Sequence, residues 1–79
     1  MKPENITVGK TYRNRGAGTT VRTVLDIGPG NELCQKRPNV AIPPTTDLCV
    51  VYHQTSHRDR DIWALSLKSF AQWAGSEMV

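Results

Sequence analysis

The sequence lacks a long apolar run, a secretory leader and the cysteine content of a disulfide-stabilised domain. No stretch approaches the roughly 20 apolar residues of a membrane-spanning helix, and residues 1–5 have no apolar signal core. The two cysteines are Cys34 and Cys49, whereas a small secreted domain usually carries several disulfides. These absences predict a soluble cytoplasmic protein with no membrane partner and two reduced thiols. A disulfide between the two cysteines is the alternative.

Two short motifs that imitate nucleotide-handling sites lack required residues. Val8-Gly9-Lys10-Thr11 ends like a phosphate-binding loop, but that loop needs an earlier glycine, where Glu4 stands, and a following helix. The sequence His-Arg-Asp at 57–59 imitates a kinase catalytic loop, which needs an asparagine where this chain has Ala64. Neither motif predicts nucleotide chemistry, and Gly9 is expected to allow a bend or bulge.

Cys49, His53 and His57 have a regular spacing that suggests zinc ligands. Residues four apart on one strand lie about 13 Å apart, too far to share an ion. Chelation would require the chain to fold His57 back and Cys34 to complete the site, so a buried strand cysteine and two surface histidines are the simpler prediction. No serine or cysteine has a recognisable activating neighbour either. We therefore predict a protein that is not an enzyme and has no catalytic residue, cofactor or metal.

Size and composition indicate one small folded domain spanning residues 1–79. Hydrophobic residues make up 38% and charged residues 22% of the chain, which are near ordinary globular values. The net charge is +3, from ten Lys and Arg against seven Asp and Glu. That balance suits binding to nucleic acid, binding to an acidic protein surface, or solubility alone.

The first part of the chain has the pattern of a β-hairpin. Residues 7–13 alternate, with Val8, Lys10 and Tyr12 on one face, and residues 19–27 are rich in β-branched side chains. The glycine-containing residues 14–18 form the expected turn. In the second strand, alternate side chains are expected to be buried: Val21, Thr23, Leu25 and Ile27. The intervening side chains are expected to face solvent: Thr20, Arg22, Val24 and Asp26.

Residues 29–47 are predicted to form a long proline-rich loop, mobile or functional. Prolines at positions 29, 38, 43 and 44 interrupt this segment and disfavour helix. Its Val-Ala-Ile sequence at 40–42 is expected to form at most a short edge strand. Residues 1–6 are predicted to be a flexible N-terminus.

The C-terminal part has the clearest patterns. Residues 48–54 are almost all apolar, as in a central strand covered on both faces, and residues 61–65 are its expected antiparallel partner after a polar turn. One helical face then follows at residues 67, 70, 71 and 74, with Ser66 as N-cap and Gly75 at the helix end. Trp73 lies beside this stripe and is expected to be a rim contact or a half-exposed anchor.

These patterns together predict a mainly β fold with one C-terminal α-helix. The architecture that fits is a small bent antiparallel sheet of four or five strands, or an SH3-like partly open barrel, closed by the short helix. The patterns specify this class of fold more firmly than they specify any function.

Basic residues concentrate on the predicted hairpin and in the long loop. An aromatic side chain beside basic residues in a small barrel is a known way to hold single-stranded nucleic acid. The alternative is a solvated charged edge that prevents aggregation. The candidate partner-binding or nucleic-acid-binding residues are Lys10, Tyr12, Arg13, Arg15, Arg22, Lys36 and Arg37.

Four segments resemble small bacteriophage and prophage accessory proteins. They are Val-Gly-Lys-x-Tyr-x-Asn-Arg-Gly at 8–16, Arg-Thr-Val-Leu-Asp-Ile-Gly at 22–28, Val51-Tyr52, and Leu67-x-x-Phe70-x-x-Trp73-Ala74. The resemblance covers most of the chain outside residues 29–47, and its motifs are structural in character. It implies an accessory protein that acts in the bacterial host cytoplasm, for example by blocking a host factor or a defence complex.

Three functional hypotheses follow for this chain. The first is a protein-binding module that inhibits or redirects a bacterial host protein or nucleoprotein complex. The second is direct nucleic-acid binding through the same basic surface. The third is a virion or assembly component that self-associates through edge strands and Trp73.

Overall fold

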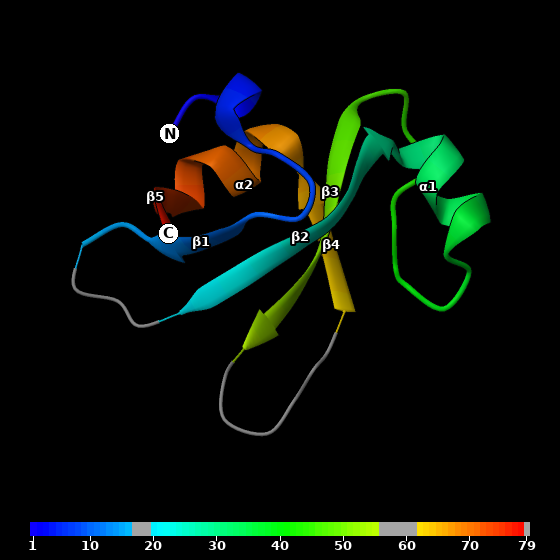
Figure 1. The fold of residues 1–79 in the computed structure, drawn as a ribbon. Coiled ribbons are helices and arrows are strands. Elements are labelled where there is room, and N and C mark those ends of the chain that lie inside the picture. The colour runs from blue at the N-terminus through cyan, green and yellow to red at the C-terminus, as the bar shows by residue number, and fades with distance from the viewer. Residues whose placement is uncertain (17–19, 56–61, 79) are drawn as a thin grey trace.

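The computed structural model describes residues 1–16, 20–55 and 62–78 of the chain (Figure 1). In this described part, one open antiparallel sheet has the strand order β4-β3-β2-β1-β5. The strands are β1 (Thr11–Asn14), β2 (Val21–Pro29), β3 (Leu48–Thr55), β4 (Ile62–Ser66) and β5 (Ala74–Met78). The helices are the 3-10 turn η1 (Pro3–Asn5), α1 (Gly30–Lys36) and α2 (Leu67–Trp73). The prediction of a small, mainly β fold with a closing C-terminal helix is confirmed.

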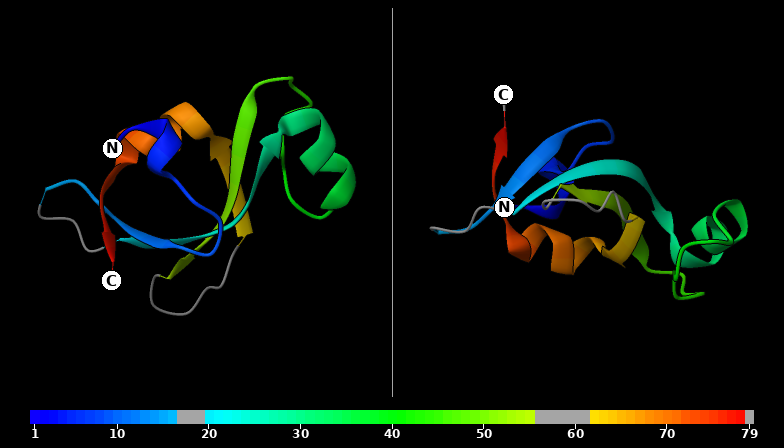
Figure 2. Two further views of the ribbon diagram at one scale, coloured as in Figure 1. Left: turned by 45° about the horizontal axis from the view of Figure 1, so that its top comes forward. Right: turned by 90° about the horizontal axis from the view of Figure 1, so that it is seen from below.

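Strand β3 lies inside the sheet and is covered on both of its faces, as its apolar run predicted. Val50 and Tyr52 belong to a first buried cluster, which includes residues of α2. Cys49 and Val51 belong to a second cluster, which includes Leu33 of α1. Since successive side chains on a strand point to opposite faces, α1 and α2 pack on opposite faces of the sheet. Helix α1 projects from one end of the sheet, away from α2 and both termini (Figures 1 and 2).

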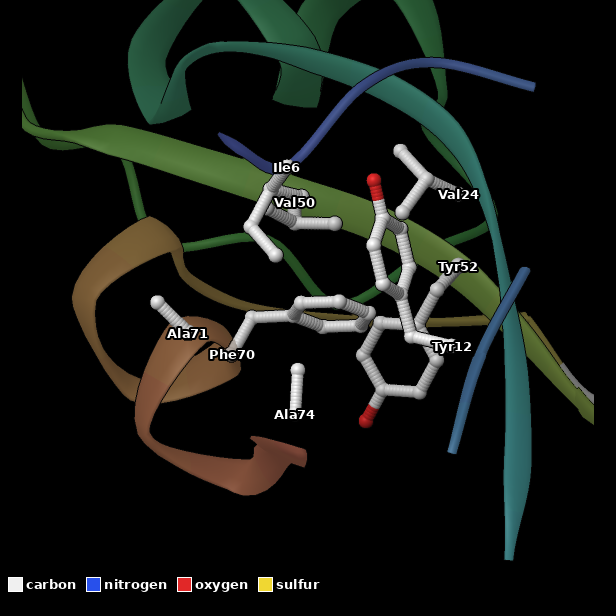
Figure 3. Packing of buried hydrophobic residues seen from close by; sticks show 8 residues of the cluster. All are labelled: Ile6, Tyr12, Val24, Val50, Tyr52, Phe70, Ala71 and Ala74. Carbon is white, nitrogen blue, oxygen red and sulfur yellow. The ribbon is translucent and has the colours of Figure 1, made fainter. Parts of the chain in front are cut away.

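Aromatic rings fill the first cluster. The Phe70 ring lies between those of Tyr12 and Tyr52, with centroid distances of 5.9 and 5.4 Å (Figure 3). Phe70 comes from α2, whose N-cap is Ser66 as predicted, because the Ser66 hydroxyl accepts a hydrogen bond from the Ser69 amide at 3.1 Å. The predicted helical stripe is therefore the face that α2 buries against the sheet.

The predicted alternation of β2 is only partly right, because the strand contains a bulge: Leu25 and Ile27 pack against the buried clusters as expected, but Val24, expected in solvent, is buried. The pairing register with β3 shifts between Val24 and Asp26, so that Leu25 is an extra residue. Val24 is 1% exposed and shares the first cluster with Ile27, while Leu25 packs against the second cluster. A strict period of two places Val24 and Ile27 on opposite faces, and the bulge between them brings both to the face of the first cluster.

Strand β5 follows α2 directly and was not predicted. Gly75 was expected to end the helix, but helical geometry already ends at Ala74, which has an extended backbone. Glycine is required at position 75 for a different reason, because a Cβ there would lie 2.9 Å from the Cα of Arg15. Gly75 therefore allows β5 to approach β1 closely at the irregularity in their pairing.

The segment 29–47 is not a loop throughout, because α1 occupies Gly30–Lys36. None of the prolines lies within these residues, and several of them are good helix formers. Gly30 is buried, and a Cβ there would overlap the carbonyl oxygen of Pro43. Residues 40–42, which could have formed a short edge strand, form none, and this described segment contributes Ile42 to the second cluster.

The N-terminal residues pack against the domain, in contrast to the predicted flexible segment 1–6. Ile6 is 6% exposed, and the terminal amino group donates hydrogen bonds to the Ala71 and Ala74 carbonyls. Strand β1 begins at Thr11 rather than at residue 7, because Gly9 has a φ of +87° in a turn. The predicted bend at Gly9 is thus confirmed.

Candidate binding face

Part of the sheet is covered by neither helix. On the face opposite α2, the strand register aligns Met78, Thr11, Thr23, His53 and Ile62 in one row across the five strands. Ser76, Arg13 and Val21 form the adjacent row on the same face. Helix α1 covers only the far end of this face, around Cys49 and Val51. We call the remaining part the open face, and its members are Thr11, Arg13, Val21, Thr23, His53, Ile62, Ser76 and Met78.

The open face carries an exposed cation on a surface of hydroxyl and apolar groups. Arg13 is exposed and belongs to β1. Next to it, the hydroxyls of Thr11 and Thr23 share a hydrogen bond of 2.9 Å across the two strands. None of the eight named members of the open face is a carboxylate. Glu77 pairs with Tyr12 on the opposite face, and Asp26, which pairs with Val51 on the same side of the sheet, lies towards α1 and forms salt bridges with Lys36 and Arg37. Within the ranges 1–16, 20–55 and 62–78, Arg13 forms no salt bridge.

Lys10 and Arg15 are the exposed cations at the two ends of β1. Neither forms a salt bridge with a residue that the structure describes. The Arg15 amide donates to the Trp73 carbonyl at 3.2 Å, which holds the backbone after β1 against the end of α2. Lys10, Arg13 and Arg15 therefore lie along β1 and at its two ends, and the strand register places only Arg13 on the open face.

Arg22 belongs to the opposite face and makes internal contacts. Its position pairs with that of Tyr12, and its guanidinium lies between the rings of Tyr52 and Trp73, at 4.6 and 4.2 Å from their centroids. Its Nε donates to Gln54 Oε1 at 3.0 Å. Burial lowers the pKa of Arg22, and the Tyr52 hydroxyl partly offsets this effect. The prediction of a solvent-facing Arg22 is wrong, because two aromatic rings cover its charge.

Lys36 and Arg37 lie at the end of α1 and do not join the β1 cations. Both pair with the Asp26 carboxylate, at 4.0 Å from Lys36 Nζ and 3.8 Å from Arg37 Nε. Because Asp26 neutralises part of their charge, they are a weaker anion-binding pair than the β1 cations. The single basic surface expected from the sequence is thus divided among three locations.

Tyr12 cannot contact a partner, contrary to its predicted role. It is 0% exposed and belongs to the first cluster. Its hydroxyl accepts from the Thr7 amide at 2.8 Å and donates to the Asn5 carbonyl at 3.1 Å. Tyr12 therefore fixes the N-terminal segment to the core.

The two cysteines are free thiols, as the preferred prediction stated. Cys49 is 1% exposed, and burial, followed by the nearby Asp47 charge, raises its pKa. The described residues include no group of three metal-ligating side chains. His57, with the whole kinase-like motif 57–59 and the predicted polar turn, lies outside the described residues.

Sequence reasoning missed the exposed apolar residues of β4. Ile62 is 43% and Trp63 is 54% exposed, and they begin an edge strand. The sequence predicted a strand at residues 61–65 but not the exposure of these two side chains. The available signal was the position of the segment, because the last strand of a hairpin is an edge unless another strand joins it.

Comparisons with protein-family models, with curated proteins and with solved structures find no match to this chain. Among the described residues, no helix has the length and apolar character needed to cross a membrane. The candidate site therefore depends on its own geometry, which is that of a sheet surface covered by neither described helix, with an exposed arginine on it and the nearest described carboxylate, Asp26, already paired with Lys36 and Arg37.

Proposed function

We propose that this protein is a binding module that occludes an acidic surface of a bacterial host protein. One observation carries the proposal: Lys10, Arg13 and Arg15 are exposed along β1 and form no salt bridge with any described residue. A partner carboxylate that meets these cations gains charge-assisted hydrogen bonds without breaking an internal pair. We further propose a phage-type accessory role in the host cytoplasm, which rests on the sequence resemblance alone.

The open face provides the contact area around these cations. Binding would bury Arg13, the threonine pair and the half-buried Val21 together, and a guanidinium desolvated at the centre of such a surface is a typical energetic anchor. Ile62 and Met78 are the members of the open face that belong to the two edge strands, where they are 43% and 46% exposed. The mechanism is steric occlusion, since no group on this face needs to react.

Two findings favour a protein partner over nucleic acid. Single-stranded nucleic acid is commonly held by aromatic side chains on which its bases stack. Tyr12, the aromatic residue nearest the β1 cations in sequence, is buried, and the Trp73 ring packs on Arg22. A labelled oligonucleotide titrated at two salt concentrations tests the nucleic-acid alternative, because phosphate contacts produce a steep loss of affinity with salt.

We also propose the finer description of the fold as an SH3-like, partly open barrel. Two features support it. Strand β1 pairs with both β2 and the last strand β5, and α2 connects the edge strand β4 to β5. Such a barrel leaves part of its outer surface free for a partner.

The test is recovery of partners from a bacterial lysate with paired charge reversals. Arg13→Glu with Arg15→Glu should remove the specific partner, because it replaces the cations by like charges. The matched control is Lys2→Glu with Lys68→Glu, which changes the net charge equally at two exposed positions, the residue before η1 and a residue of α2. We expect the control to retain the partner. Equal recovery by both variants, with both folded, would contradict the proposal.

A further inference from the structure

The two edges of the sheet differ in their protection against pairing with another strand. Strand β5 has a charged residue, Glu77, and its pairing with β1 is irregular at Gly75. Strand β4, Ile62–Ser66, contains no charge, proline or glycine, and its register with β3 is unbroken. Natural sheets protect their edges with charges, prolines, bulges or short strands. By these criteria, β4 is the less protected edge.

Among the described residues, no strand other than β3 pairs with β4. Apart from the ladder to β3, no backbone hydrogen bond joins residues 62–64 to another residue of the described ranges. An antiparallel strand uses alternate amides and carbonyls for each neighbour. The amides and carbonyls of β4 that point away from β3 therefore have the spacing that another extended strand would match.

We infer that the occupant of this edge is β4 of a second copy, paired antiparallel. The sequence Ile-Trp-Ala-Leu-Ser has apolar Trp63 and Leu65 on either side of Ala64. A twofold axis at Ala64 places Trp63 of each copy opposite Leu65 of the other, on one face of the joined sheets. Residues 62–66 carry no charge, so no like charges face each other within the paired strands.

The exposed side chains of β4 are consistent with this arrangement. Trp63 is 54% exposed, although it belongs to the face that bears the first cluster, where it pairs with Tyr52. Contact with Leu65 of the second copy covers part of this ring. Ile62 is 43% exposed on the opposite face and pairs with Ser66 of the second copy in the same register.

The self-association goes beyond the proposed binding role and does not require it. A twofold axis perpendicular to the sheet keeps the open faces of both copies on one side. Two sets of β1 cations then form one extended surface, which increases avidity for an acidic partner. Loss of dimerisation with retained partner binding would separate the two proposals.

The test is the molar mass in solution over a range of protein concentrations, by sedimentation equilibrium. We expect the apparent mass to rise towards that of a dimer. Ile62→Lys and Trp63→Lys should each weaken association at least about tenfold, because a lysine on an edge opposes strand pairing. The matched control is Val8→Lys, since Val8 is 51% exposed and belongs to no strand.

Amide hydrogen exchange of the unaltered protein gives a second readout that needs no variant. Amides within residues 62–65 should exchange more slowly at high than at low protein concentration. Three results would each overturn the inference: a monomer at every concentration, equal weakening by Val8→Lys, or a dimer in which exchange at 62–65 does not depend on concentration.

Discussion

The guanidinium of Arg22 lies 4.2 Å from the centroid of the Trp73 ring, which joins the middle of the sheet to the end of α2. The centroid of the Tyr52 ring lies 4.6 Å from the same guanidinium, and Gln54 Oε1 accepts a hydrogen bond from Arg22 Nε. The charge is thereby removed from the basic surface and serves to hold the helix against the sheet. This contact also explains why Trp73, beside the apolar stripe of its helix, is half-buried.

Arg22→Lys should lower the free energy of unfolding by about 1–2 kcal/mol. A lysine keeps the charge but loses the planar group that stacks on two rings and bonds Gln54. Urea denaturation followed by tryptophan fluorescence measures the change. Arg13→Lys is the control, because the exposed Arg13 should tolerate the same replacement within about 0.5 kcal/mol. Equal stability of the two variants would show that the stacked arrangement contributes nothing.

Tyr52 makes stability depend on pH in the alkaline range. Burial raises its pKa above the ordinary value, and the nearby Arg22 charge only partly opposes this. The folded state therefore holds the phenol proton more tightly than the unfolded state, so the stabilisation is complete below about pH 10 and is lost as pH rises further. Tyr52→Phe should reduce the loss of stability above about pH 10. An unchanged pH profile in this variant would contradict the assignment.

The two thiols should differ sharply in reactivity. Cys49 is buried in the second cluster and its pKa is raised by burial, so little reactive thiolate is accessible in the folded protein. Cys34 is half-buried, with its thiol 3.3 Å from the Asn31 carbonyl. A thiol reagent should label one cysteine in the native protein and both after denaturation. Labelling of Cys34→Ser at the native wild-type rate would count against this order.

Gly75→Ala should destabilise the pairing of β5 with β1. The added methyl group lies 2.9 Å from the Arg15 Cα and 3.0 Å from the Asn14 carbonyl oxygen, which are backbone atoms that cannot move aside cheaply. We expect a loss of about 1–3 kcal/mol, typical of overpacking. Hydrogen exchange of the amides in residues 74–78 should accelerate. Ser76→Ala is the control on the same strand, and its effect should be small because Ser76 is exposed.

The sequence predicted β3 and α2 correctly, because nearby residues determine both elements. The apolar run of β3 and the helical spacing of α2 with its Ser66 cap each carry their signal within about ten residues. Strand β5 has weak strand formers, Ala-Gly-Ser-Glu-Met, and exists because β1 offers it an edge. Its prediction would have required the tertiary structure.

The candidate site was predicted in composition but not in arrangement. The sequence identified Lys10, Arg13 and Arg15 because cations on a polar hairpin are usually exposed. It could not separate Arg22 from them, since the partners of Arg22 lie 30 and 51 residues away at Tyr52 and Trp73. The burial of Tyr12 was missed for the same reason, because Phe70 and the N-terminal segment pack on Tyr12 only in the folded chain.

The most direct test of the binding face is an amide chemical-shift titration of the labelled protein with the partner recovered from lysate. We predict that the largest changes fall on Thr11, Arg13, Val21 and Thr23, and that they diminish as salt is added. Changes confined to α2 and its side of the sheet, with residues 11–13 and 21–23 unaffected, would contradict the assignment of the open face as the binding surface.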